Sequence, residues 1–246
     1  MPGKIVHEIG PTPDSPRKSA GGFVTHRDGR VSYIYGHYDG TGDGSPACLA
    51  ECTSGDGGST WSESTIMLRP EADAAKGVTG VSLMHMENGD LGLFYRVLTE
   101  EHDLRLHLRT SSDDGATWGP SSPCIPIPGY FVTNNDRVVR LLSGRIVVPA
   151  ASYVGQKAKS PQISRFFLSD DDGTTWRESA ASCYLQSRRT ETGLQEPGLV
   201  ELGNGSLWAW FRTDIGVQYE SFSFDKGETW TPPEPSVFSP DTLRAI

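Results

Sequence analysis

Apolar and polar residues alternate in short runs of about five residues along most of the chain, which is the period of a β-strand with one buried face. Four pairs of such runs are joined by tight turns that end in glycine, a strong local signal of a β-hairpin. These turns are Asp28-Gly29, Asn88-Gly89, Ser143-Gly144 and Asn204-Gly205. No helix-length segment carries the 3.6-residue apolar period of a surface helix. The pattern therefore predicts an all-β fold.

A second pattern, Ser-x-Asp-x-Gly-x-Thr-Trp (the Asp box), occurs four times without a mismatch. The copies begin at Ser54, Ser111, Ser169 and Ser223. Aspartate accepts hydrogen bonds from backbone N–H groups a few residues on, and glycine adopts a positive φ without strain. The motif thus predicts a tight turn, with the tryptophan entering the core at the start of the next strand. This interpretation is favoured over a catalytic or calcium-binding role for Asp56, Asp113, Asp171 and Asp225.

Each repeat combines a hairpin with a third strand that leads into the Asp box and a fourth that leaves it. Such a four-stranded antiparallel meander is the blade of a β-propeller. We expect blades over about residues 20–70, 79–127, 134–185 and 196–238, with 239–246 as the first strand of a fifth. Together they form a single incomplete propeller domain over residues 1–246, whose open blade edges are possible sites of chain pairing.

Composition limits the classes of partner. The chain carries 22 basic and 31 acidic residues, a net charge of −9, which argues against nucleic acid or an anionic membrane surface. The four cysteines lack CxxC spacing and the six histidines lack an HExxH motif, so neither a metal nor another cofactor is predicted. No apolar run reaches spanning length and no secretory signal is visible at Met1. We expect a soluble protein. The visible sequence favours the cytoplasm, but it does not determine the compartment.

Strand direction predicts where a binding site lies. Because antiparallel strands reverse at every turn, the hairpin turn and the Asp box share one end of each blade. The start of the first strand and the end of the second share the opposite end. Polar residues gather there: Arg17, His37, Asp39, Asp43, Arg96, Asn134, Asn135, Asp136, Arg137, Gln195, Glu196, Arg212 and Asp214. Arginines, carboxylates and amides at one end of a rigid scaffold are typical of a polar binding site.

These features resemble the sialidase (neuraminidase) superfamily, in particular bacterial sialidase-domain proteins with BNR repeats. The resemblance runs from about residue 13 to the end of the chain. It rests on the Asp boxes, Gln195-Glu196-Pro197-Gly198, Phe211-Arg212-Thr213-Asp214, Asn134–Val139 and Ser143–Ala151. It implies a six-bladed sialidase-like β-propeller and a retaining exo-α-sialidase, a glycosidase that removes terminal sialic acids from glycoconjugates.

The resemblance also implies roles for residues. In the family, three arginines bind the substrate carboxylate, a tyrosine is the nucleophile, a glutamate accepts its proton and an aspartate is the acid and base. By position, Glu196 resembles the tyrosine's partner, and Arg17 and Arg212 resemble two of the arginines. Asp43 is the first candidate for the acid and base, and Asp39 the second. Arg96, Asp136 and Arg137 are further candidates for substrate binding. For each of these residues a structural role is the alternative to a functional one: an ion pair at the rim, a solvated surface charge or a turn residue.

The sequence also departs from the family pattern. In the family, the third arginine and the nucleophilic tyrosine belong to later blades. Tyr219 lies on the third strand of its blade, too far from the central channel to replace that tyrosine. A fragment of a longer enzyme is favoured over a natural four-bladed relative or a protein completed by another chain. We expect this chain to be weak or inactive as a sialidase. The alternatives are a non-catalytic Asp-box propeller that binds a glycan or a protein, and a glycosidase acting on another sugar.

Overall fold

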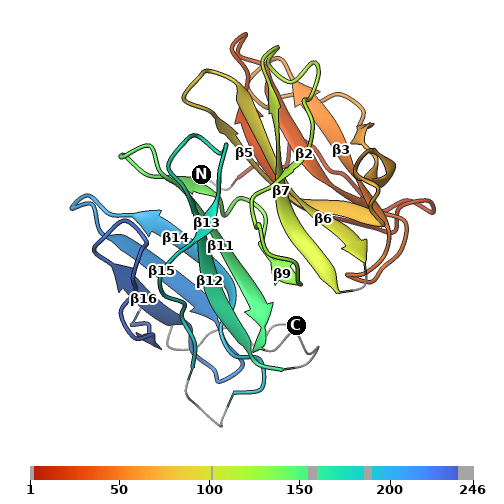
Figure 1. The fold of residues 1–246 in the computed structure, drawn as a ribbon. Coiled ribbons are helices and arrows are strands. Elements are labelled where there is room, and N and C mark those ends of the chain that lie inside the picture. The colour runs from red at the N-terminus through yellow and green to blue at the C-terminus, as the bar shows by residue number, and fades with distance from the viewer. Residues whose placement is uncertain (1–2, 101, 155–159, 186–189, 238–246) are drawn as a thin grey trace. The chain divides into compact units, whose positions relative to one another are not determined.

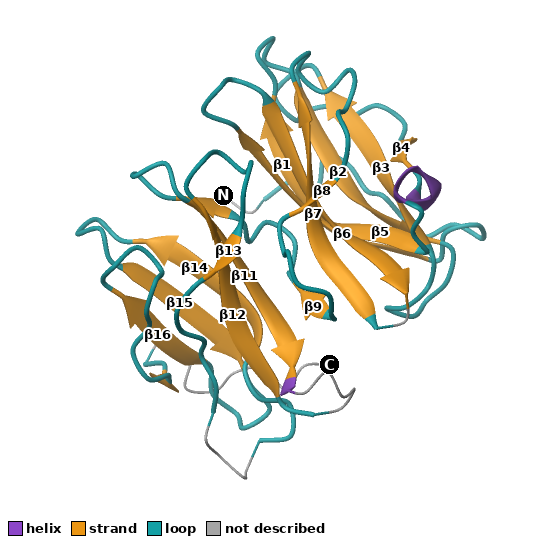
Figure 2. Cartoon of the chain, in the orientation of Figure 1, coloured by secondary structure: helices purple, strands orange, loops and turns teal. Residues whose placement is uncertain are grey.

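The computed structural model describes residues 3–100, 102–154, 160–185 and 190–237. Strands dominate this part of the chain and are joined by loops and the short 3₁₀ helix η1 (Pro70–Asp73) (Figure 2). They form four antiparallel sheets in which neighbours in sequence pair with one another. The prediction of an all-β fold built from antiparallel meanders is confirmed. The strand expected at residues 239–246 lies outside the described residues.

The chain divides into two compact units. The first comprises residues 1–101 and 107–122 and contains most of the first two sheets. In Figure 1 these sheets run from red to yellow-green. The first sheet consists of β1 (Arg17–Thr25), β2 (Val31–Tyr38), β3 (Ala47–Ser54) and β4 (Thr65–Leu68). The second consists of β5 (Gly77–His85), β6 (Leu91–Glu100), β7 (Asp103–Ser111) and β8 (Ser122–Pro123).

The core of the first unit comes from alternate positions of these strands. Side chains that point to the same side of a strand are two residues apart, so every second residue reaches the core. The buried cluster consists of Ile34, Leu49, Val78, Val81, Leu93, Tyr95 and Val97. This alternation holds the two sheets of the unit together.

The second unit comprises residues 102–106 and 123–246. Its third sheet contains β10 (Val139–Arg140), β11 (Ile146–Tyr153), β12 (Gln162–Ser169) and β13 (Arg177–Glu178), and β9 (Phe131–Val132) also pairs with β11. Its fourth sheet contains β14 (Gln195–Glu201), β15 (Leu207–Arg212), β16 (Tyr219–Ser223) and β17 (Glu234–Pro235). The core between them includes Leu141, Val147, Phe166, Leu168, Leu194, Leu207 and Phe211.

The third sheet departs from the expected four-strand pattern. Its first strand is split, because Val132 pairs with Ala151 and Val139 pairs with Val147 while the residues between them leave the ladder. Asp136 lies in this interval with a φ of 54°. A left-handed residue bends the chain out of a regular strand. The sheet therefore has five strands in place of four.

The Asp box folds as predicted, with the acid bonded to its own turn. In the second copy, the Ser111 hydroxyl donates to Asp113 Oδ1 at 2.7 Å and the Thr117 amide donates to the same oxygen at 2.8 Å. The Thr117 hydroxyl donates to Asp113 Oδ2 at 2.6 Å. These hydrogen bonds, first those from the Thr117 hydroxyl and amide, lower the pKa of Asp113 to about 2. The same three bonds hold Asp56, Asp171 and Asp225.

The prediction that the Asp-box tryptophans enter the core is wrong. All four are only partly buried, so they cover the edge of the core and do not enter it. Trp118 packs against the core of the first unit and Trp230 against that of the second, where its ring centroid lies 4.0 Å from that of Phe166. In two copies the indole N–H is bound to its own turn: Trp61 donates to the Gly58 carbonyl and Trp176 to the Gly173 carbonyl, each at 3.0 Å. A ring tied to its turn stays at the end of the sheet.

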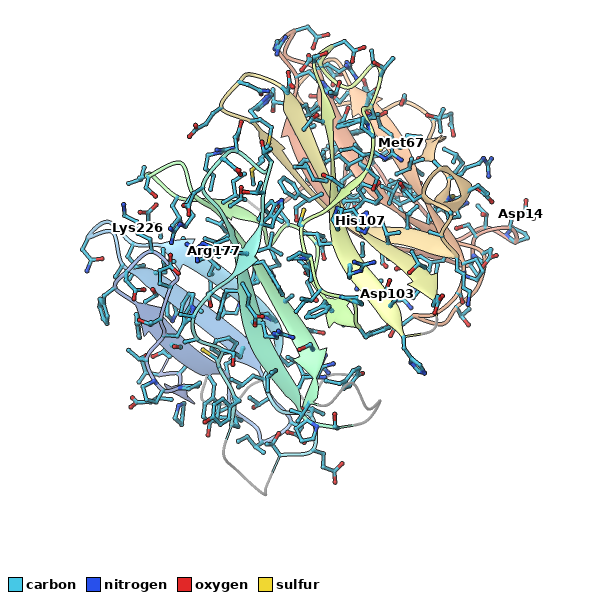
Figure 3. The ribbon with its side chains drawn as sticks, in the orientation of Figure 1. Asp14, Met67, Asp103, His107, Arg177 and Lys226 are labelled. Carbon is cyan, nitrogen blue, oxygen red and sulfur yellow. The ribbon has the colours of Figure 1, made fainter. Side chains whose placement is uncertain are left out.

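The Asp boxes of the third and fourth sheets are joined by an ion-pair network. Arg145 donates to Asp170 through Nε at 2.6 Å and to Glu228 through Nη1 at 2.9 Å. Arg177 donates to Glu228 through Nη1 at 2.8 Å. Arg145 Nη1 also donates to the carbonyl of Lys226, and Figure 3 shows Lys226 and Arg177 near one another on the second unit. The network fixes the turn end of these two sheets.

Candidate functional site

The candidate residues of the fourth sheet lie at the end opposite to its Asp box. At one end of β15, Leu207 pairs with Ser223, the first residue of that Asp box. At the other end, Arg212 pairs with Gln195, the neighbour of Glu196. The first sheet repeats this arrangement, with Ser54 at one end of the β2 ladder and Arg17 at the other. The predicted separation of polar groups from turn residues therefore holds within each of these sheets.

Glu196 and Arg212 form an ion pair. Arg212 Nη1 donates to Glu196 Oε1 at 2.8 Å, and the two side chains are 39% and 42% exposed, respectively. β14 positions the acid through a bulge between Gln195 and Gly198, and β15 supplies the arginine across it. Sequence reasoning placed both residues at this end of the sheet, and the structure brings them into contact.

The backbone of Glu196 is strained. Its φ is 49°, in the left-handed region that favours glycine. This conformation costs a non-glycine residue roughly 1–2 kcal/mol, whereas an exposed ion pair contributes about 0–1 kcal/mol. The pair with Arg212 is half-exposed, so it does not offset the cost of the backbone. Strained residues of this kind cluster at sites where geometry serves binding or catalysis.

The second sheet carries a related arrangement at the same register. Arg96 pairs with Thr79, and a bulge between Thr79 and Ser82 contains Gly80 with a φ of 67°. Gly80 thus corresponds to Glu196, and Arg96 corresponds to Arg212. A Cβ at Gly80 would collide with the Nε of Arg96, so the guanidinium occupies the space above the glycine. Among the described residues, this Nε is buried without a hydrogen-bond partner.

Arg17 and Asp43 form an ion pair among the candidate residues of the first unit. Arg17 Nη1 lies 2.5 Å from Asp43 Oδ1 and also donates to the Thr41 carbonyl at 3.3 Å. The Arg17 guanidinium stacks over the ring of Tyr38, 4.9 Å from its centroid. Asp43 is 89% exposed and sits in a turn closed by the Ser45 amide on the Gly42 carbonyl. Arg17 is therefore held at a defined place and is not a free surface charge.

Tyr38 connects this pair to the second sheet. Its hydroxyl lies 2.6 Å from Thr79 Oγ1, and Thr79 is the cross-strand partner of Arg96. Arg17, Tyr38, Thr79 and Arg96 thus form a continuous row within the first unit. Tyr38 and Thr79 were missed from the sequence. The strand register could have identified them, because Tyr38 is the cross-strand partner of Arg17.

Asp136 and Arg137 differ in their surroundings. Asp136 is exposed and left-handed, a conformation that aspartate tolerates well, so turn chemistry accounts for it. The Arg137 guanidinium lies over Trp210, 5.4 Å from the ring centroid. Trp210 was also missed, although its position two residues before Arg212 places both side chains on one face of β15. In the second unit the candidate groups are therefore Arg137, Glu196 and Arg212.

Residues 36–241 match the family of the BNR repeat-like domain. The anhydrosialidase of Macrobdella decora is 30% identical over 135 residues, which cover 51% of this chain and 16% of that protein. The chain therefore spans only a small part of the curated relative that it matches.

Solved structures are similar in fold. A protein of unknown function from Dyadobacter fermentans superposes with a TM-score of 0.74 at 19% identity, over 92% of this chain and 71% of that one. The Hadza microbial sialidase Hz136 gives a TM-score of 0.71 at 19% identity, over 94% of this chain and 48% of that one. The fold is that of a sialidase-like β-propeller. No helix in the described part of the chain is both long and apolar enough to cross a membrane.

Proposed function

Because the chain belongs to the BNR repeat-like domain family, we propose that it is part of a glycoside hydrolase of the exo-α-sialidase type, which cleaves terminal sialic acids from glycoconjugates. The observation that carries this proposal is the Glu196–Arg212 pair, held at 2.8 Å on a strained backbone opposite the Asp box. Neither fold stability nor turn chemistry accounts for that arrangement.

The chemistry of the substrate fits these groups. Sialic acid carries a carboxylate, and guanidinium groups bind carboxylates through paired, charge-assisted hydrogen bonds. In the first unit we propose Arg17 and Arg96 for substrate binding, and in the second unit Arg212, with Arg137 as a further contact.

Two carboxylates are proposed for catalysis. Glu196 would accept the proton of a tyrosine nucleophile, and its contact with Arg212 keeps the carboxylate oriented. Asp43 would serve as acid and base, because its exposed position on a turn lets it reach a bound glycoside. Asp136 is proposed as a weaker contact to substrate hydroxyls.

A second candidate function is binding without catalysis, through the same polar groups. It is favoured by Tyr219, which pairs with Phe211 and packs against the core of the second unit. Because its ring packs against the core, Tyr219 is not proposed as the nucleophile. We therefore expect this chain to bind a sialylated glycan and to hydrolyse it weakly or not at all.

The test combines turnover and binding. Purified chain is incubated with a fluorogenic sialoside, free and anhydro forms of sialic acid are quantified, and affinity for sialyllactose is measured by calorimetry. We expect binding that weakens at least about tenfold in Arg212→Ala and Glu196→Gln, since each removes one charged partner. Glu178→Gln is the control, because Glu178 forms a comparable ion pair with Arg165 on β12 and β13. Absence of sialyllactose binding by the unaltered chain contradicts the proposal.

A further inference from the structure

Asp214 holds the loop that leads into β14. Its Oδ1 accepts a hydrogen bond from the Thr190 hydroxyl at 2.5 Å. Its Oδ2 accepts from the backbone amides of Glu191 at 2.7 Å and Thr192 at 3.3 Å. The Thr190 hydroxyl oxygen accepts in turn from the Gly193 amide at 2.9 Å. One carboxylate therefore organises four consecutive residues.

The other side of this loop is fixed by β12. Gly193 has a φ of 71°, and a Cβ there would collide with the backbone of Gln162. The Gln162 amide donates to the Thr192 carbonyl at 2.8 Å, and the Leu194 amide donates back to the Gln162 carbonyl at 3.0 Å. Leu194 is fully buried in the core of the second unit. The loop thus has a defined shape up to the residue before β14.

Asp214 connects this loop to the end of β15. It follows Arg212 by two residues, and the loop that it binds ends directly before Gln195 and Glu196. The Gln195–Arg212 ladder pair is the last of the sheet, and a bulge separates it from the next pair, Gly198–Trp210. A terminal pair behind a bulge is weakly held by the ladder alone, since fraying is least costly at strand ends.

From these contacts we infer that Asp214 is a positioning residue, which clamps the ends of β14 and β15 and so fixes the Glu196–Arg212 pair in its binding geometry. The inference rests on the proposed function of that pair as a sialic acid site. Asp214 itself acts through the loop and the strand ends.

The charge state of Asp214 agrees with this role. Burial alone would raise the pKa of Asp214, but hydrogen bonds from the Thr190 hydroxyl and the Glu191 amide outweigh it, so the pKa lies below its ordinary value. The carboxylate is therefore ionised at neutral pH. As an ionised acceptor it forms stronger hydrogen bonds to the two amides than a neutral group would.

The experiment compares Asp214→Asn with Asp225→Asn. Both aspartates belong to the fourth blade, both accept three hydrogen bonds, and they lie at opposite ends of the sheet. Asn keeps one acceptor oxygen but removes the negative charge that strengthens these hydrogen bonds, so the clamp is weakened without a change of size. We expect Asp214→Asn to weaken sialyllactose binding at least about tenfold, because small misplacements of binding groups are costly. We expect Asp225→Asn to leave the affinity unchanged.

A ligand-free readout separates this inference from the proposed function. The Arg212 Nε–Hε signal in NMR spectra and the hydrogen exchange of the Gln195 amide both report on the pair directly. We expect Asp214→Asn to shift the signal and speed the exchange, whereas Asp225→Asn changes neither. If the unaltered chain binds no sialyllactose, the proposed function fails, and these two measurements still decide on the clamp. Unchanged signals in Asp214→Asn, or equal changes in both variants, overturn it.

Discussion

Glu196 has a backbone conformation that suits glycine better, as its counterpart Gly80 in the second sheet demonstrates. We predict that Glu196→Gly is more stable than Glu196→Ala by about 1 kcal/mol, because both lose the ion pair but only glycine relieves the left-handed strain. For a chain of this size, that difference corresponds to a Tm higher by about 2–4 °C. Thermal unfolding followed by circular dichroism measures it. Equal Tm values for the two variants would mean that the bulge carries no strain.

At this scale the sequence predicted which residues cluster but not how they touch. Reversal of antiparallel strands placed Glu196 and Arg212 at one end of a blade, and their contact confirms that placement. The strain could not be predicted, because glutamate has no preference for a positive φ. Nor could the stacking of Arg137 on Trp210, which joins the segment between β9 and β10 to β15. Such contacts depend on packing between elements.

At the scale of elements, Arg145 is the central residue of the network between the third and fourth Asp boxes. It is 13% exposed and binds Asp170 and Glu228 at once, whereas Arg177 binds the same acids and is 48% exposed. We predict that Arg145→Met lowers stability by about 2 kcal/mol and Arg177→Met by less than about 0.5 kcal/mol, because solvent screens the outer arginine. Chemical denaturation at low and high salt tests both. A larger loss for Arg177→Met would contradict this ranking.

The elements themselves were largely predictable. Glycine turns between alternating runs located the hairpins, and the Asp box located the turn between third and fourth strands. The split of the first strand in the third sheet was not predictable, because residues 132–139 contain apolar positions at both ends and the break comes from one left-handed aspartate. The tryptophans were also misjudged, since the indole N–H groups of Trp61 and Trp176 donate to carbonyls of their own turns.

At the scale of the whole molecule, the four Asp boxes make stability sensitive to acid. Hydrogen bonds lower the pKa of all four aspartates, to about 2 for Asp56 and Asp113. A carboxyl group whose pKa is lower in the folded state stabilises the fold above its unfolded pKa of about 3.9. That contribution is lost as the pH falls from about 4 toward 2, because protonation then favours the unfolded chain.

We therefore predict that Tm falls steeply between about pH 4 and pH 2 and changes little between pH 5 and 7. In Asp113→Asn the fall should be smaller than in the unaltered chain, since the amide does not titrate. Calorimetric scans across this range provide the measurement. An identical slope in both proteins would show that the Asp boxes do not control acid stability.

The shared bulge of the second and fourth sheets has a consequence for how such repeats diversify. The backbone has a positive φ within a bulge at both Gly80 and Glu196. A single substitution at this position can therefore change the functional group that the blade presents without a change in strand pairing. Gly80→Glu would place an acid beside Arg96 once the guanidinium had moved away from the space above residue 80. Duplicated blades thus offer evolution, and the protein engineer, interchangeable positions for building a new active centre.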